Sequence, residues 1–176
     1  MSLSLGIDLG TSGVRTAVLG EDGAVLSSAR APHTARATGP IDARDWWDSV
    51  AACIRAQVSE LGLLGFSGTD ISRIAVDGTS GSMVLTDASL APVGPALMYN
   101  SKGFTGEAAR IAALCPAADH IAQGSNSALA RALRLLGQAE RTPAHLLHQA
   151  DFIAAKLIGR GGRSDVNNAL KTGFDP

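Results

Sequence analysis

The first residues of the chain alternate strictly between apolar side chains and small or polar ones. The apolar positions are Leu3, Leu5, Ile7 and Leu9. A period of two is typical of a β-strand with one face toward the core, so the pattern predicts a strand over residues 3–9. On the other face the carboxylate of Asp8 stands between Gly6 and Gly10, where little side-chain volume surrounds it.

Further apolar runs separated by turn residues predict that this strand opens an antiparallel meander. Residues 14–19 form a second run, and the glycines and acidic residues at 20–23 are a strong turn signal. A third strand begins at residues 24–26. A stretch containing proline and glycine then indicates a loop over residues 31–41.

Helical periodicity follows this loop. Asp42 is suited to cap a helix over residues 43–61. The apolar stripe of this helix repeats at steps of four and consists of Trp46, Val50, Ile54 and Val58. This stripe predicts that Trp46 and the adjacent Trp47 belong to the core, with the alternative that one of them borders a pocket at the helix start.

The second half of the chain is predicted to form strands first and mainly helices afterwards. The expected elements are a strand over 71–76, a hairpin of residues 83–86 and 93–98, a helix over 105–114 ended by Pro116, a helix capped by Ser125 or Asn126 and ending at Gly137, and a helix from Thr142-Pro143 to Gly159, followed by a polar turn. With the meander, these elements predict an α/β fold whose mixed sheet is flanked by helices.

The end of the first strand carries residues suited to a nucleotide and its metal ion. Asp8 is followed by the turn Gly10-Thr11-Ser12-Gly13, whose backbone amides and hydroxyl groups can face a phosphate. A carboxylate beside such a turn fits hydrated Mg²⁺, which uses few protein carboxylates. Arg15 follows on the next strand, from which a guanidinium can reach a phosphoryl group. The alternatives are a hairpin with nothing bound and, for Arg15, a solvated arginine at the strand edge.

The strand predicted at 71–76 ends in Asp77-Gly78-Thr79-Ser80-Gly81, which repeats the carboxylate and the Gly-Thr-Ser-Gly turn of the first strand. In a sheet with a helical crossover, ligands gather beyond the carboxyl ends of the strands. We therefore expect both turns at one cleft. The first would hold phosphate, and the second would hold a hydroxyl-rich substrate through Asp77, Thr79 and Ser80.

Composition places the chain among ordinary globular proteins. Its 176 residues are 45% hydrophobic and 18% charged with a net charge of −1, which argues against a nucleic-acid partner held by bulk charge. The sequence shows no membrane span, no signal-peptide pattern, no G-x-G-x-x-G after a strand and no P-loop. Cys53 and Cys115 lack CxxC spacing, so we expect buried thiols in a reducing, cytoplasmic compartment, with a disulfide between them as the alternative.

Three ionisable residues follow one another at three-residue steps on the helix predicted from Thr142. They are His145, His148 and Asp151. In principle they can bind a metal, although the usual helical zinc pair is spaced by four and needs a third ligand. A solvated helix face explains them better.

Taken in chain order, these motifs resemble the N-terminal domain of the FGGY carbohydrate kinases, within the ribonuclease H-like (actin-like ATPase) fold. The segments that carry the resemblance are residues 6–13, the helix start at Trp46, residues 75–81, residues 149–159, Ser164-Asp165 and residues 168–173. The resemblance implies ATP and Mg²⁺ as cofactors and a small-molecule sugar as substrate. It implies that the Asp8 hairpin contacts the phosphates and Mg²⁺, with Thr11 and Arg15 near the γ-phosphate.

The resemblance also implies that the turn after Asp77 borders the sugar. Here that turn continues Ser80-Gly81-Ser82-Met83, without the Gln common in xylulose, glycerol and gluconate kinases, and Tyr99-Asn100-Ser101-Lys102 lacks the usual Asp and Arg. These features are most similar to D-ribulose kinases of the plant and cyanobacterial type, in which Ser80 and Asp8 would touch the ketopentose. The alternatives are a xylulokinase-like or other FGGY polyol kinase, or a non-catalytic actin-like nucleotide-binding switch.

By the same resemblance, the catalytic base and the adenosine pocket lie outside this chain. A sugar kinase needs a carboxylate that accepts the hydroxyl proton, and the family's Asp would follow Pro176. We therefore expect residues 1–176 to be a partial N-terminal FGGY kinase domain, incomplete at its C-terminus and inactive alone. Its unfinished sheet would leave an apolar edge through which a second copy could pair as a homodimer.

Overall fold

The computed structural model describes residues 2–33, 41–115 and 120–174. The chain divides into a first unit, made of residues 1–38 and 44–78, and a second unit, made of residues 39–43 and 79–176. Pro116, which was predicted to end a helix, and most of the loop predicted at 31–41 lie outside the described residues.

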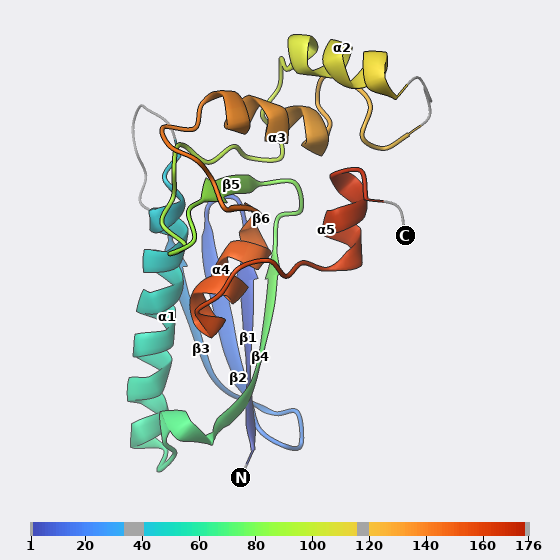
Figure 1. Cartoon of the computed structure of the whole chain (residues 1–176). Helices are drawn as coiled ribbons and strands as arrows, with labels where there is room; N and C mark the ends of the chain where they lie inside the picture. The colour runs from blue at the N-terminus through green and yellow to red at the C-terminus, as the bar shows by residue number, and fades with distance from the viewer. Residues whose placement is uncertain (1, 34–40, 116–119, 175–176) are drawn as a thin grey trace. The chain divides into compact units, whose positions relative to one another are not determined.

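Four strands form the sheet of the first unit (Figure 1). They are β1 (Leu3–Leu9), β2 (Gly13–Leu19), β3 (Val25–Pro32) and β4 (Ile71–Gly78). Their order is β3-β2-β1-β4, with β1–β2 and β2–β3 antiparallel and β4 parallel to β1. The predicted mixed sheet that opens with an antiparallel meander is therefore confirmed, although β3 extends to Pro32, into the stretch predicted as loop.

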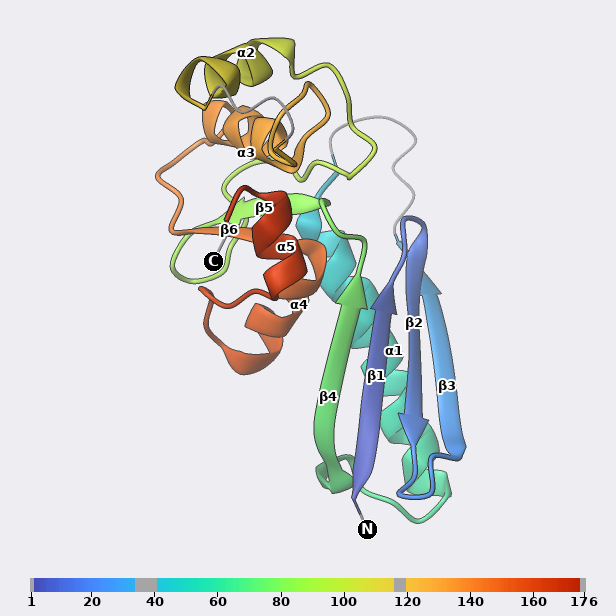
Figure 2. The same cartoon turned by 90° about the vertical axis from the view of Figure 1, so that its right-hand side faces the viewer.

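Helix α1 (Ala43–Leu63) covers one face of this sheet, as Figures 1 and 2 show from two sides. The apolar side chains of β1 are buried, whereas Asp8 on the opposite face is exposed. Trp46 is 1% exposed, which confirms its place in the core, and Trp47 is half-buried. The hydrophobic period of the sequence therefore sets which face of the sheet is free for a ligand.

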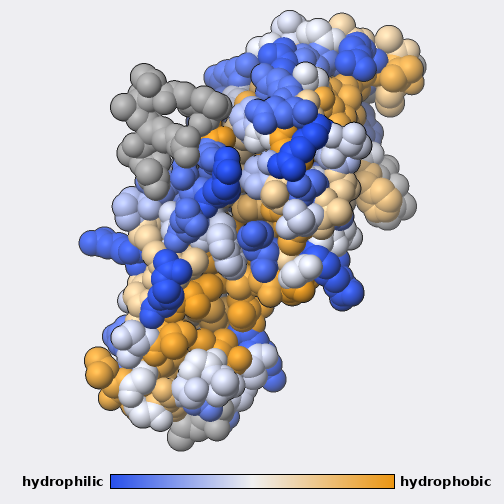
Figure 3. All heavy atoms as spheres, turned by 60° about the vertical axis from the view of Figure 1, so that its left-hand side comes forward, coloured by the Kyte–Doolittle hydropathy of each residue, from blue (hydrophilic) through white to orange (hydrophobic). Residues whose placement is uncertain are grey.

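Polar contacts fix α1 against β3. The Ser27 hydroxyl donates to Glu60 at 2.5 Å, and the Gln57 side-chain amide donates to the Ser27 carbonyl at 3.3 Å. Beyond these contacts, apolar side chains are exposed at the C-terminal end of α1, namely Val58, Leu63 and Leu64. Figure 3 shows large apolar areas in the lower part of its view. The 3₁₀ turn η1 (Gly68–Asp70) then leads into β4.

The second unit contains a two-stranded sheet that the sequence did not predict. Strand β5 (Met83–Thr86) pairs antiparallel with β6 (His145–His148). The hairpin predicted between residues 83–86 and 93–98 is confirmed in part. Met83 and Leu97 form an antiparallel bridge and the Val93 N–H donates to the Leu85 carbonyl at 3.0 Å, but the segment at 93–98 forms no continuous strand. Pro95 in its middle has no backbone N–H and cannot continue a ladder.

The helices of the second unit are α2 (Thr105–Leu114), α3 (Ala128–Gly137), α4 (Gln149–Ile158) and α5 (Val166–Lys171). Helix α2 has its predicted bounds, and α3 is capped by Ser127 instead of Ser125 or Asn126. The helix predicted from Thr142 begins only at Gln149, because residues 145–148 pair with β5. Helix α5, capped by Asp165, replaces the polar turn predicted there.

Helix α3 and strand β5 share a core cluster in the second unit. Its buried members are Met83, Leu85, Val93, Ala128, Ala132 and Leu135. Cys53 is buried as predicted, but Cys115 is exposed, and both thiols are free, so the disulfide alternative is wrong. Among the described residues, no helix combines the length and the apolar character that a membrane crossing requires.

Candidate functional site

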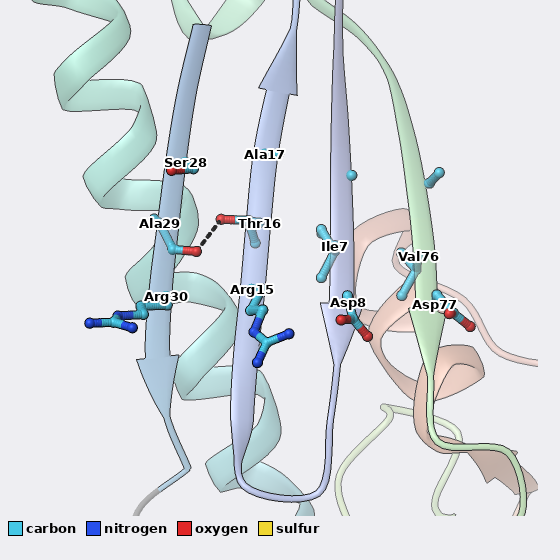
Figure 4. A pocket seen from close by; sticks show the side chains of 12 residues that line it. Ile7, Asp8, Arg15, Thr16, Ala17, Ser28, Ala29, Arg30, Val76 and Asp77 are labelled. Atoms are coloured by element: carbon cyan, nitrogen blue, oxygen red, sulfur yellow. Dashed lines mark hydrogen bonds between the residues drawn. The ribbon is translucent and has the colours of Figure 1, made fainter. Parts of the chain in front are cut away.

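Four charged side chains form a row across the sheet of the first unit, on the face opposite α1. The row consists of Arg30 on β3, Arg15 on β2, Asp8 on β1 and Asp77 on β4. Each is the direct register partner of the next, and all four are exposed (Figure 4). The sheet topology thus places two guanidinium groups beside two carboxylates.

Two hollows adjoin this charged row. One, of about 870 Å³, includes Asp8, Arg15, Arg30 and Asp77 in its lining. The other, of about 440 Å³, lies at the β1–β2 turn and is lined by Asp8, Gly10, Ser12, Gly13, Val14, Arg15, Arg30, Ala31 and Pro32. The structure therefore brings the predicted residues Asp8, Gly10, Ser12, Gly13 and Arg15 together. Thr11 is exposed on the same turn but does not line either hollow.

Close packing against β3 fixes the conformation of this turn. The Gly10 N–H donates to the Gly13 carbonyl at 2.9 Å. A Cβ atom on Gly13 would lie 2.6 Å from the Ala31 carbonyl oxygen and 3.0 Å from the Pro32 Cα. Only glycine therefore allows β3 to run this close to the turn.

His33, which the sequence analysis missed, supports the turn from the end of β3. Its backbone N–H donates to the Ser12 carbonyl at 3.0 Å, and its Nε2 lies 3.1 Å from the Gly10 carbonyl. Its Nδ1 lies 3.3 Å from the Ser49 hydroxyl on α1. Burial lowers the pKa of His33, against the Gly10 hydrogen bond and the charge of Asp45, which raise it. A neutral ring with the proton on Nε2 donates to the Gly10 carbonyl, while the Ser49 hydroxyl donates to the Asp45 carbonyl at 2.8 Å.

Like charges that lie directly opposite each other on neighbouring strands repel. This holds for Arg15 with Arg30 and for Asp8 with Asp77. An anion beside the arginines and a cation beside the carboxylates would relieve both repulsions. Within the part of the chain that the structure describes, no group of three or more His, Cys, Asp or Glu side chains could hold a metal. One or two carboxylates with water ligands nevertheless suit Mg²⁺.

The predicted residues Thr79 and Ser80 belong to the second unit, so their sharing a cleft with the β1–β2 turn stays a prediction. The Thr79 N–H donates to Gln149 at 3.1 Å. The Ser80 hydroxyl donates to the Asn168 side-chain oxygen at 2.7 Å, and the Asn168 amide donates to Asp165 at 2.6 Å. Because Ser80 gives its proton to Asn168, its free lone pair can accept from a ligand hydroxyl.

The metal-binding alternative and the solvated helix face considered for His145, His148 and Asp151 are both corrected. His145 and His148 lie on strand β6 and Asp151 on α4, and His148 and Asp151 are only 3% and 6% exposed. Asp151 accepts from the Ser164 hydroxyl at 2.7 Å and from the His148 N–H at 3.2 Å. Burial lowers the pKa of His148 and raises that of Asp151. His148 and Asp151 therefore belong to the buried interior of the second unit.

A hollow of about 230 Å³ in the second unit adjoins the Ser80 turn. It is lined by Ser80, Gly81, Tyr99, Ile121, Asn126, Ser127, Ala128, Arg131 and Lys171. Tyr99 and Lys171 come from the Tyr-Asn and Asn-Ala-Leu-Lys segments singled out in the sequence. Arg131 was missed, because nothing in the pattern of α3 distinguishes it from a solvated arginine.

Solved structures of sugar kinases share this fold. A xylulose kinase from Rhodospirillum rubrum superposes with a TM-score of 0.76 at 20% identity, covering 98% of this chain and 37% of that one. A glycerol kinase from Plasmodium falciparum, solved with ADP, gives a TM-score of 0.73 at 12% identity over the same shares. The fold is thus that of sugar kinases of the actin-like ATPase type.

Sequence comparison defines the family. Residues 3–123 match the FGGY family of carbohydrate kinases, N-terminal domain. The chain therefore belongs to the FGGY family. A xylulose kinase from Streptomyces coelicolor is 30% identical over 112 residues, which are 62% of this chain and 22% of the relative. A xylulose kinase from Escherichia coli is 28% identical over 100 residues, 54% of this chain and 20% of the relative. The matched part thus spans about a fifth of these curated relatives.

Proposed function

We propose that a protein containing this domain transfers the γ-phosphoryl group of ATP to a hydroxyl of D-ribulose or a related ketopentose. The observation that carries the proposal is the register of Asp8 with Arg15 beside the tightly packed β1–β2 turn. It combines a carboxylate for a hydrated cation with guanidinium groups and backbone for an anion. This is the donor set that a nucleotide with Mg²⁺ requires.

On the phosphate side, Asp8 would hold Mg²⁺ through its water ligands. Bound there, the ion would neutralise charge on the triphosphate. The backbone of Gly10 and Gly13 and the hydroxyls of Thr11 and Ser12 would hold phosphate oxygens. Arg15 would approach the transferred group, and the exposed Arg30 beside it adds a second positive charge. Catalysis would come mainly from positioning and electrostatics.

On the sugar side, Ser80 would accept a hydrogen bond from a sugar hydroxyl, since its own proton is directed to Asn168. Asp77 and Thr79 complete the predicted substrate residues. The ketopentose assignment is supported by the Asp-Gly-Thr-Ser-Gly turn, the Tyr-Asn pair and the Asn-Ala-Leu-Lys segment. The proton of the attacking hydroxyl would pass to a carboxylate supplied by residues beyond Pro176.

Xylulose is the second candidate substrate, and the curated relatives named xylulose kinases favour it. A panel of D-ribulose, D-xylulose, glycerol and gluconate, assayed with ATP and Mg²⁺ on the complete protein, separates the candidates. We expect ADP release to be stimulated most strongly by D-ribulose. ATP hydrolysis that ignores every sugar would instead indicate a nucleotide-dependent switch and would contradict the proposal.

A further inference from the structure

Arg131 is a buried cation whose hydrogen bonds, within the described residues, all go to backbone carbonyl oxygens. The residue is 2% exposed, and burial lowers its pKa. One terminal nitrogen donates to Gly81 at 2.8 Å, and the other donates to Tyr99 at 2.7 Å and lies 3.2 Å from the Asn126 carbonyl. A buried guanidinium whose hydrogen bonds go to neutral carbonyl groups is costly, which indicates a role beyond packing.

The carbonyls that Arg131 contacts belong to three separate segments of the second unit. These are the turn after β4, the segment at residues 99–101 and the loop that precedes α3. The same segments line the hollow of about 230 Å³ beside Ser80. A planar guanidinium with five N–H donors can satisfy several converging carbonyls at once, which a lysine ammonium does less well. Arg131 therefore holds the wall of this hollow together.

The peptides on both sides of Gly81 are fixed. Its N–H donates to Nδ1 of His148 at 3.1 Å, and its carbonyl accepts from Arg131. Its φ of +88° is a left-handed conformation that glycine adopts easily, and a Cβ there would lie 3.3 Å from the Arg131 guanidinium. His148 thus holds the peptide bond that follows Ser80, and Arg131 holds the next one, so the backbone beside Ser80 is fixed from two sides.

We propose that Arg131 is a positioning residue for the sugar: through Gly81, it orients the Ser80 hydroxyl and shapes the hollow beside it. The inference rests on the proposed function, because it takes Ser80 to face the sugar. It assigns no chemical step to Arg131, which acts through the turn.

The test compares Arg131→Met and Arg131→Lys with the wild type in the complete enzyme. Methionine keeps much of the volume without a donor, and lysine keeps the charge without the planar fork. We expect the KM for the sugar to rise by up to about fivefold in Arg131→Met, the effect of losing one hydrogen bond of roughly 1 kcal/mol, and less in Arg131→Lys. The KM for ATP should stay within about twofold, because the carbonyls that Arg131 contacts all belong to the second unit. If Arg131→Met does not fold, the rise in Arg131→Lys decides.

Arg134→Met is the matched control. Arg134 lies on the same helix and over the same Phe104 ring, at 5.2 Å against 5.8 Å for Arg131, but its guanidinium bonds Glu107 and not the turn. We expect its sugar KM to equal that of the wild type. An unchanged sugar KM in both Arg131 variants, an equal rise in both KM values, or the same rise in Arg134→Met would overturn the inference.

Amide hydrogen exchange over residues 79–82 gives a readout that does not depend on activity. We expect faster exchange there in the Arg131 variants than in Arg134→Met, and equal exchange would overturn the inference. Failure of the proposed function would look different. No sugar would then stimulate ADP release in the wild-type enzyme, while the exchange experiment would still report whether Arg131 holds the turn.

Discussion

On the exposed face of the sheet, Asp8 lies in register with Arg15 on one side and with Asp77 on the other. The apolar side chains of β1 point to the opposite, buried face. Asp8 is exposed, and charge interactions between exposed groups contribute little to stability. A substitution there should leave the domain folded and act on what binds. Ser80 differs, because it is half-buried and its hydroxyl donates to Asn168 at 2.7 Å.

Asp8→Ala in the complete enzyme should lower kcat by about 100-fold or more, because a bound metal ion stabilises the charge that develops in the transition state by several kcal/mol. The KM for the sugar should change much less. Steady-state kinetics at several Mg²⁺ concentrations measure both. Asp8→Asn keeps the shape of the side chain without its charge, and it should lower kcat nearly as much as Asp8→Ala. A kcat equal to the wild type in Asp8→Ala would refute the metal role.

Ser80→Ala should raise the KM for the sugar by about fivefold, as expected for one lost hydrogen bond of roughly 1 kcal/mol, with ATP affinity little changed. The variant also leaves Asn168 without a donor, so Ser80→Thr serves as the control that retains the hydroxyl. Initial rates with either substrate varied supply the two KM values. An effect confined to ATP would contradict the sugar-facing role of Ser80.

The stability of the second unit should depend on pH through His148. Burial lowers the pKa of His148 most, Lys171 and Arg131 lower it further, and Asp151 and Asp165 raise it. The unfolded chain thus takes up a proton below about pH 6.5 while the folded chain resists it, so stability falls as the pH drops from there toward the folded pKa. Protonation would also put a proton on Nδ1, which accepts the Gly81 N–H.

Denaturant unfolding at pH 7.5 and 5.5 measures this loss, and His148→Gln should reduce it, because glutamine can accept the Gly81 N–H without titrating. Asp151 contributes with the opposite sign, since burial raises its pKa, and His33 contributes with the same sign as His148. The contribution of His148 is therefore the loss of unfolding free energy between pH 7.5 and 5.5 in the wild type minus that in His148→Gln. An identical pH dependence in the two would show that His148 does not cause it.

At the scale of whole elements, the close approach of β3 to the β1–β2 turn is the contact most sensitive to a single methyl group. Gly13→Ala should destabilise the chain by about 1–3 kcal/mol, because its Cβ would meet backbone atoms that cannot rotate away. Gly62→Ala in α1 meets nothing within 4 Å and should stabilise by about 0.4–1 kcal/mol. Thermal or chemical unfolding measures both effects. An unchanged free energy of unfolding in Gly13→Ala would show that the turn can shift to accommodate the methyl group.

Elements with a strong local period were predictable, and those decided by distant pairing were not. Strand β1 and helix α1 follow directly from their periods of two and nearly four. Residues 145–148 form a short apolar run that fits a helix or a strand, and pairing with β5, some sixty residues earlier, decides it. Helix α5 has six residues, too few for a periodic signal, and its capping residue Asp165 was its main mark.

The same distinction holds for the site. Asp8 and the β1–β2 turn were visible as one continuous motif, but Arg30 and His33 join it through the register of β3. Arg131 joins the Ser80 turn across fifty residues of sequence. Spacing along the chain indicates which residue types could serve a phosphate or a sugar. The fold decides which further residues support them.

At the scale of the whole molecule, the donor set of this chain suits a triphosphate and the hydroxyls of a sugar, but it includes no residue to which we assign the proton of the attacking hydroxyl. A chain that bound the triphosphate and the sugar without a base would transfer phosphate very slowly, since general-base catalysis contributes about 10²–10⁴-fold. We therefore expect residues 1–176 alone to give no sugar-dependent ADP with ATP, Mg²⁺ and D-ribulose, whereas the complete protein does. A coupled ADP assay on both makes the comparison. Sugar-dependent turnover by residues 1–176 alone would mean that the base lies within this chain, and the exposed Asp77 beside Asp8 would then be the first residue to test as that base.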